Sequence, residues 1–228
     1  MVTVSIVLEI EKYLDGVNAV IFDLDDTLYS EKQYVRSGYK SVAKLLGDET
    51  LADRLWTYFE NGKPAIDELL NELGCVEKKA ECLEAYREQI PEITLYDGVT
   101  ELIQELKSKG IKVGIITDGR VSGQKKKLAA LGLDKLADDI IITDGLGGIQ
   151  FRKPCDIAFR IIQNRWRIPF EQMIYIGDNP TKDFTAPKQL GMKSVYFKNR
   201  DGLYSRGNAV GEDEDMIEKL SDLTTIIC

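Results

Sequence analysis

The chain has no histidine among its 228 residues. This absence excludes the Ser-His-Asp triad, the Cys-His nucleophile pair and zinc sites built on imidazole ligands. Chemistry near neutral pH must therefore rest on carboxylates, lysine, hydroxyl groups, thiols or a bound metal ion.

Paired cysteines and long apolar runs are also missing. The four cysteines are scattered and form no CxxC pair, which is typical of reduced thiols in a cytosol. No apolar run approaches the roughly 20 residues that span a bilayer. Glu9 and Glu11 interrupt the N-terminal segment before a signal peptide could form. We therefore expect a cytoplasmic protein with no membrane partner.

Positive charge is in deficit, with 30 Lys and Arg against 38 Asp and Glu and a net charge of -8. This balance argues against nucleic acid or an anionic membrane surface as the main partner. A hydrophobic content of 43% over 228 residues fits one medium domain, or a core domain with a smaller inserted module.

Short β-branched and aromatic runs recur along the chain and predict five buried strands. They lie at residues 19–24, 111–117, 139–143, 172–178 and 193–197. Helical patterns separate them, for example at 99–110 and at 153–166, where Pro154 is expected at the first helical position. Alternating strands and helices favour right-handed crossovers and a mainly parallel sheet.

Residues 31–93 depart from this alternation, since they contain helical patterns and no good strand. We interpret this segment as an inserted helical domain, and residues 1–30 and 94–228 as an α/β core. The acidic stretch 211–219 is expected to be solvated and to lead into a last helix.

Four polar sequences follow four of the predicted strands. They are DLDDT at 23–27, TDG at 117–119, RKP at 152–154 and GDNPTKD at 177–183. Because the carboxyl ends of parallel strands share one edge of the sheet, we expect these residues to converge on one pocket.

The crowding of carboxylates at this edge calls for a cation. Asp23 and Asp25 share a face of an ideal strand, and Asp178 and Asp183 add two more acids. Like charges a few Å apart repel by several kcal/mol at an effective dielectric of about 20. A hard divalent ion such as Mg²⁺ would resolve the repulsion, and Lys153 can supply a further positive charge.

The set FDLDDT, ITDG, KP and GDNPTKD resembles the haloacid dehalogenase (HAD) superfamily, in its branch with a helical cap inserted after the first strand. The similarity covers roughly residues 17–197, and over the insertion it amounts only to helical character and position. It implies a Rossmann-like parallel sheet of strand order 5-4-1-2-3, with residues 31–93 as the cap.

The resemblance also implies catalytic roles. Asp23 would be the nucleophile that forms an aspartyl-phosphate, and Asp25 would be the general acid and base. Thr117 would bind phosphate oxygens together with the backbone amides of Asp118 and Gly119, with the Asp118 side chain as an alternative ligand. Lys153 would neutralise charge beside the nucleophile.

The same resemblance implies a Mg²⁺ site. The ion would be held by Asp23, the backbone carbonyl of Asp25 and Asp178, with Asp183 as a further ligand or as a partner of the ligands.

The expected function is that of a Mg²⁺-dependent phosphatase that acts on a small phosphorylated metabolite. A sugar phosphate is the first candidate substrate. A sugar phosphomutase and a nucleotidase stay open on the same scaffold. A 2-haloacid dehalogenase is disfavoured because Asp25 supplies a proton donor that a halide does not need. A non-catalytic regulatory protein that binds a phosphorylated ligand is the alternative from another class. The oligomeric state cannot be read from the sequence.

Three neighbouring features are expected to be structural. Asp26 is interpreted as a loop residue that points away from the metal. DGLGG at 144–148 lacks the ending of a phosphate-binding loop and is expected to be a turn. KKK at 125–127 is expected to be the solvated face of a helix.

Overall fold

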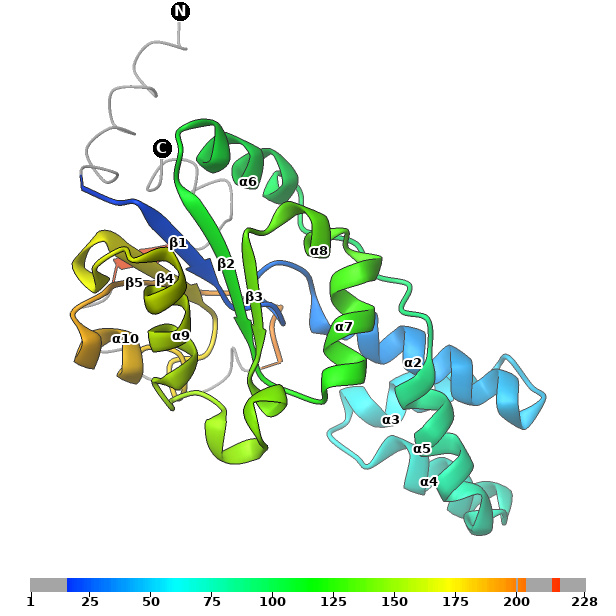
Figure 1. Cartoon of the computed structure of the whole chain (residues 1–228). Coiled ribbons are helices and arrows are strands. Elements are labelled where there is room, and N and C mark those ends of the chain that lie inside the picture. The colour runs from blue at the N-terminus through cyan, green and yellow to red at the C-terminus, as the bar shows by residue number, and fades with distance from the viewer. Residues whose placement is uncertain (1–15, 200, 204–214, 218–228) are drawn as a thin grey trace, which may run out of the picture. The chain divides into compact units, whose positions relative to one another are not determined.

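The five β-branched runs form five strands of one parallel sheet in the computed structural model, which describes residues 16–199, 201–203 and 215–217. The strands are β1 (Ala19–Phe22), β2 (Lys112–Thr117), β3 (Asp139–Ile142), β4 (Met173–Gly177) and β5 (Lys193–Phe197). Over the described ranges the order is β3-β2-β1-β4-β5-β6, so the predicted order 5-4-1-2-3 is confirmed (Figure 1). The central strand β1 pairs with β2 on one side and with β4 on the other.

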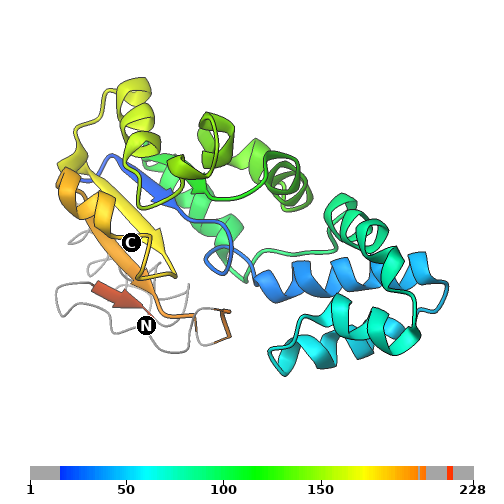
Figure 2. The same cartoon turned by 90° about the horizontal axis from the view of Figure 1, so that it is seen from below.

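The sixth strand corrects an expectation. β6 (Asp215–Ile217) pairs in parallel with β5, within the stretch that was expected to be solvated. Figure 2 shows β1, β4, β5 and β6 side by side. Acidic residues are depleted in strands, so composition gave no indication of β6. The helix expected after residue 219 lies outside the described residues.

Helices join the strands in the larger unit, which comprises the described residues up to Ser30 and from Thr94 onward. They are α6 (Val99–Ser108), α7 (Val121–Ala130), α8 (Leu133–Leu136), α9 (Ile157–Trp166) and α10 (Thr185–Leu190), with short 3₁₀ helices η2 (Thr143–Leu146), η3 (Ile149–Phe151) and η4 (Phe170–Gln172). The predicted apolar stripe of α6 is confirmed, since its members are buried: Val99, Leu102, Ile103 and Leu106.

One helix start differs from the prediction. Pro154 does not open α9, because the chain turns at Arg152–Cys155 and the helix begins at Ile157. The Lys153–Pro154 peptide bond is cis. Lys153 is part of this turn, and its side chain is buried.

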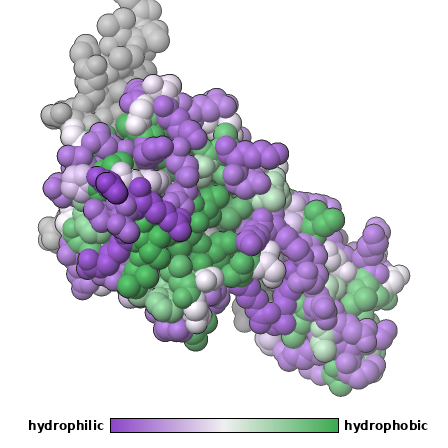
Figure 3. All heavy atoms as spheres, viewed as in Figure 1, coloured by the Kyte–Doolittle hydropathy of each residue, from purple (hydrophilic) through white to green (hydrophobic). Residues whose placement is uncertain are grey.

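The core of the larger unit lies on both faces of the sheet. Because side chains alternate along a strand, Ala19 and Ile21 face one side and Val20 and Phe22 the other, and all four are fully buried. Phe159 of α9 packs edge-on against Tyr175 of β4, with ring centroids 5.1 Å apart. At the edge strand β3 the cover is incomplete, and Figure 3 shows apolar residues gathered there between α7 and α9.

Residues Glu31–Ile93 form the second compact unit, and every regular element in it is helical. Its elements are α2 (Glu31–Leu46), α3 (Leu51–Glu60), α4 (Ala65–Leu73), the 3₁₀ helix η1 (Val76–Lys78) and α5 (Lys79–Glu88). Its own core includes Tyr39, Val42, Leu55, Leu69 and Cys82. Across the described part of the chain, no helix has both the length and the apolar character needed to cross a membrane.

Candidate active site at the strand ends

Asp23 and Asp178 leave the sheet side by side. Phe22 is paired with Ile176 across β1 and β4, and the Asp23 amide donates to the Ile176 carbonyl at 2.8 Å. Both aspartates are buried, with 1% and 5% of their surface exposed. The convergence predicted from the strand ends is therefore observed for these two residues.

Lys153 lies at the centre of the acidic groups. Its side chain is inaccessible to solvent, and Nζ is 2.6 Å from Asp23 Oδ1, 2.8 Å from Asp183 Oδ1 and 2.8 Å from the Tyr175 hydroxyl. Burial alone would lower the pKa of Lys153, but the carboxylates around it outweigh burial and raise the pKa above its ordinary value. Lys153 therefore stays charged beside Asp23.

The carboxylates of Asp23, Asp178 and Asp183 form a tight group, with one oxygen from each within 4.8 Å of the others. Burial, then the charges of Asp23 and Asp183, raise the pKa of Asp178 to about 9. Asp23 Oδ2 is buried and has no hydrogen-bond partner among the described residues. An unsatisfied buried carboxylate oxygen beside two further acids is the environment that a hard cation with oxygen ligands fits.

Asp183 differs from Asp23, because both of its oxygens have partners. Oδ1 contacts Lys153, and Oδ2 accepts from the Asn179 amide at 2.9 Å. A Cβ at Gly177 would lie 2.5 Å from Asp183 Oδ2, so this approach requires glycine. Asp183 thus shapes the 178–183 loop as well as adding charge.

Asp25 lies outside this carboxylate group and is held by three donors. Its Oδ1 accepts from Tyr29 Oη at 2.5 Å and from Lys127 Nζ at 2.7 Å, and its Oδ2 accepts from Gln124 Nε2 at 2.8 Å. The expected metal contact of Asp25 is through its backbone carbonyl, and it stays a prediction. Lys127 is only 5% exposed, so the interpretation of 125–127 as a solvated face is wrong for this residue.

The residues after β2 combine a buried hydroxyl with a tethered acid. Thr117 is fully buried, and its Oγ1 accepts from Gln124 Nε2 at 2.5 Å. Asp118 Oδ1 accepts from Thr143 Oγ1 at 2.8 Å and from the Lys153 amide at 3.1 Å. The Asp118 side chain therefore joins the loop after β2 to Thr143 and to the turn that contains Lys153. The phosphate contacts of the Asp118 and Gly119 amides stay predictions.

A second lysine reaches the site and was not anticipated. Lys182 Nζ is 3.8 Å from Asp23 Oδ2 and 3.8 Å from Asp118 Oδ2, and its side chain is 26% exposed. Burial opposes ionisation of Asp23, but Lys153 and Lys182 outweigh it and hold its pKa below the ordinary value. Asp23 is therefore a carboxylate at neutral pH.

Besides Lys182, sequence reasoning missed three residues near the site: Gln124, Lys127 and Tyr175. Gln124 and Lys127 are spaced i, i+3 on α7, which places them on one helix face, but nothing local shows that this face is buried. Asp26, interpreted as a loop residue, is also 1% exposed and has a φ of 54°. Its Oδ2 accepts from the Leu203 amide at 2.7 Å, so it fixes the loop after β5.

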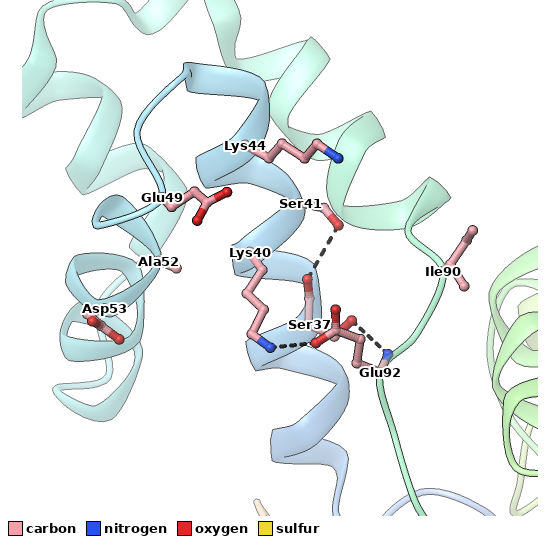
Figure 4. Close-up of a pocket in the computed structure, with 9 residues that line it drawn as sticks. All are labelled: Ser37, Lys40, Ser41, Lys44, Glu49, Ala52, Asp53, Ile90 and Glu92. Atoms are coloured by element: carbon pink, nitrogen blue, oxygen red, sulfur yellow. Dashed lines mark hydrogen bonds and ion pairs between the residues drawn. The ribbon is translucent and has the colours of Figure 1, made fainter.

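The helical unit contains a groove of its own, of about 650 Å³. In it, Lys40 is paired with Glu92 at 2.5 Å, and the Glu92 amide donates to Ser37 Oγ at 3.0 Å (Figure 4). None of the predicted site residues lines this groove.

The fold and the site together define a Rossmann-like α/β protein with buried carboxylates and a lysine at the carboxyl edge of its sheet. The sequence model of the haloacid dehalogenase-like hydrolases matches residues 20–197. The chain belongs to this family, as the sequence motifs predicted.

Similar proteins share most of its length. Glyceraldehyde 3-phosphate phosphatase of Methanocaldococcus jannaschii is 27% identical, over 90% of this chain and 98% of its own. Ribulose-1,5-bisphosphate 5-phosphatase of Halopiger xanaduensis is 23% identical, over 92% and 98%. The magnesium-bound crystal structure of the HAD-hydrolase YfnB from Bacillus subtilis superimposes with a TM-score of 0.67 at 22% identity, over 92% and 98%. The last of these supports the fold.

Proposed function

We propose that this protein is a Mg²⁺-dependent phosphatase that hydrolyses a small phosphomonoester, a sugar phosphate, through an aspartyl-phosphate intermediate. The observation that carries the proposal is the state of Asp23. It is buried, held ionised by Lys153 at 2.6 Å, and has one oxygen without a hydrogen bond next to two further carboxylates. A carboxylate in this state is a nucleophile and a cation ligand at once.

In the proposed first step, one oxygen of Asp23 attacks phosphorus and the bond from phosphorus to the leaving oxygen breaks. Asp25 gives its proton to that oxygen, since an alkoxide is a poor leaving group. The Thr117 hydroxyl donates a hydrogen bond to a phosphate oxygen, and Lys153 offsets the negative charge that the dianion brings beside Asp23. In the second step Asp25 takes a proton from water, which attacks the aspartyl-phosphate and releases inorganic phosphate.

Three carboxylates fit the ion that this chemistry needs. Asp23 and Asp178 would hold Mg²⁺ together with the backbone carbonyl of Asp25, and Asp183, already engaged by Lys153 and the Asn179 amide, would act mainly by orienting the loop. When bound, Mg²⁺ supplies positive charge that draws the phosphate dianion towards the acidic site.

Other reactions on this scaffold are less well supported. A 2-haloacid dehalogenase needs neither a proton donor at Asp25 nor a carboxylate group suited to a cation. A phosphomutase would use the same residues and return the phosphoryl group to the sugar. The non-catalytic alternative is disfavoured because every position that the chemistry requires is filled.

The choice of a sugar phosphate draws on the relatives, which are named as phosphatases of glyceraldehyde 3-phosphate and ribulose 1,5-bisphosphate. We assign substrate selection to the helical unit Glu31–Ile93, acting as a cap. A nucleoside monophosphate is the second candidate.

The test is phosphate release from p-nitrophenyl phosphate and glyceraldehyde 3-phosphate with Mg²⁺, measured for wild type and Asp23→Asn. We expect turnover by the wild type, loss of turnover on adding EDTA, and none by Asp23→Asn, whose amide is not a nucleophile. Asp134→Asn, an exposed acid on α8, is the matched control and should match the wild type. Wild-type rates in Asp23→Asn would contradict the assignment.

A panel of phosphorylated metabolites then separates the alternatives. The highest kcat/KM for a triose or pentose phosphate would support the proposal, and the highest value for a nucleoside monophosphate would favour a nucleotidase. Conversion of a hexose 1-phosphate into its 6-phosphate without phosphate release would identify a phosphomutase.

A further inference from the structure

Helix α7 buries two long polar side chains that the proposed mechanism does not yet use. Gln124 and Lys127 are 3% and 5% exposed and lie on the same face of the helix. Residues of these types are rarely buried unless their polar ends have partners. Here the partners belong to the site itself.

Both side chains hold the carboxylate of Asp25. Lys127 Nζ donates to Oδ1 at 2.7 Å, and Gln124 Nε2 donates to Oδ2 at 2.8 Å. Each oxygen of Asp25 thus has a donor from α7, and charge-assisted hydrogen bonds of this length hold a side chain in one orientation.

Gln124 has a second contact that reaches the phosphate side of the site. Its Nε2 also donates to Thr117 Oγ1 at 2.5 Å. The NH₂ group of the Gln124 amide thus faces both Asp25 Oδ2 and Thr117 Oγ1. Since Thr117 Oγ1 accepts from Gln124, its own hydrogen is left to donate elsewhere.

We propose that Gln124 and Lys127 are positioning residues: both fix the Asp25 carboxylate as the base for the second half-reaction, and Gln124 directs the Thr117 hydroxyl towards phosphate. This inference rests on the proposed function. In the step concerned, water attacks phosphorus of the aspartyl-phosphate, its proton passes to an Asp25 oxygen, and the bond between phosphorus and Asp23 breaks. A base acts only within hydrogen-bond reach of the proton it removes, so a displaced Asp25 slows this step.

The consequence is a kinetic signature. With p-nitrophenyl phosphate, formation of the aspartyl-phosphate needs no proton donor, because p-nitrophenolate leaves readily. Loss of Lys127 should then lower kcat, which reports hydrolysis of the intermediate, and leave kcat/KM, which reports its formation, almost unchanged. A purely structural tie between α7 and the Asp25 loop would lower both together.

The experiment compares Lys127→Met, Gln124→Leu and Asp25→Asn with the wild type in steady-state and stopped-flow assays. We expect Lys127→Met to lose about tenfold to a hundredfold in kcat, to keep its kcat/KM, and to release a burst of p-nitrophenolate equal to the enzyme concentration. Gln124→Leu should show the same burst and bind inorganic phosphate about tenfold more weakly, the equivalent of one lost hydrogen bond.

Controls separate positioning from folding. Lys125→Met changes an exposed lysine of the same helix and should behave as wild type. Lys127→Arg keeps a charged donor and should recover part of kcat. If Lys127→Met does not fold, as judged by circular dichroism, the burst of Gln124→Leu gives the test instead, because its kcat/KM also falls with the lost contact to Thr117.

A double-mutant cycle completes the test. Adding Lys127→Met to Asp25→Asn should not lower kcat further, because the effects of two substitutions are not additive when one residue acts through the other. If the wild type is active and Lys127→Met loses kcat and kcat/KM equally, or if the two substitutions are fully additive, this inference is overturned and the proposed function still stands. A wild type without phosphate release would overturn the proposed function and this inference with it.

Discussion

At the scale of single residues, the two oxygens of Asp23 have different surroundings. Oδ1 accepts from Lys153 at 2.6 Å, whereas Oδ2 has no hydrogen bond within the described part of the chain. A buried acceptor left unsatisfied costs about 1–3 kcal/mol. Under the proposed function, this is an atom that a cation or phosphorus would contact, which would offset the cost.

Gly177 is a second residue on which the site depends. Gly177→Ala would place a methyl group 2.5 Å from Asp183 Oδ2, so Asp183 must move away from Lys153 and the Asn179 amide. We expect a loss of about 1–3 kcal/mol in the free energy of unfolding, as for other overpacked sites, and weaker Mg²⁺ binding. Urea denaturation and Mg²⁺ titration by calorimetry measure the two effects.

Gly145→Ala is the matched control for this prediction. The nearest atom to its added Cβ is Val121 Cγ2 at 3.4 Å, so stability and Mg²⁺ binding should change little. Unaltered Mg²⁺ affinity in Gly177→Ala would mean that Asp183 contributes nothing to the ion site.

At the scale of elements, the edge strand β3 is anchored by the acid before it. Asp138 Oδ2 accepts from the Val113 amide of β2 at 2.9 Å, and Lys107 and Lys112 lie 3.5 Å from its Oδ1. Burial opposes ionisation of Asp138, but these three groups outweigh it and hold its pKa below the ordinary value. The carboxylate thus joins β3 to β2 and to α6.

The sign of the pH dependence follows from this lowered pKa. A depressed carboxyl pKa contributes stability above the unfolded value of about 3.9, and this contribution is lost as the pH falls through the folded pKa. Asp138→Asn should therefore unfold about 1 kcal/mol more easily at pH 7, and the difference should shrink below pH 4. Urea denaturation at both pH values measures it, with Asp134→Asn as control; a difference that grows in acid would contradict the assignment.

The elements also show what sequence patterns can predict. β-branched runs between glycines and charges indicated β1 to β5, because a buried parallel strand needs such residues on both faces. β6 has no such run. It is a strand because it pairs with β5, and this contact joins segments that are separated in the sequence, so a local pattern does not reveal it. The same reason hid Lys127: its spacing predicts a helix face, and only tertiary packing makes that face the side that meets Asp25.

At the scale of the whole molecule, the helical unit is inserted between two segments that lie side by side. Tyr29 and Leu95 form an antiparallel bridge, and the Tyr96 amide donates to the Leu28 carbonyl at 3.0 Å. The helical unit also has its own apolar core. An insertion whose ends meet can be removed without stretching the remaining chain.

This arrangement predicts that a variant with residues 31–93 replaced by a glycine-serine linker of about four residues folds as the α/β unit. The groups of the proposed ion and phosphate site, among them Asp23, Lys153, Asp178 and Asp183, all belong to that unit. Mg²⁺ at a hundred times its Kd should therefore stabilise the variant, like the full chain, by about 2.7 kcal/mol. The thermal midpoint with and without Mg²⁺ measures this shift.

Asp178→Asn in the same deletion variant is the control, and it should lose most of the Mg²⁺ shift because the ion loses a carboxylate ligand. Selectivity separates the roles of the two units: the deletion variant should hydrolyse p-nitrophenyl phosphate and sugar phosphates with less discrimination than the full chain, since the proposed cap selects the leaving group. A folded deletion variant that showed no Mg²⁺ shift would place an essential ligand in the helical unit. In that case the strand-end carboxylates alone would not make the ion site.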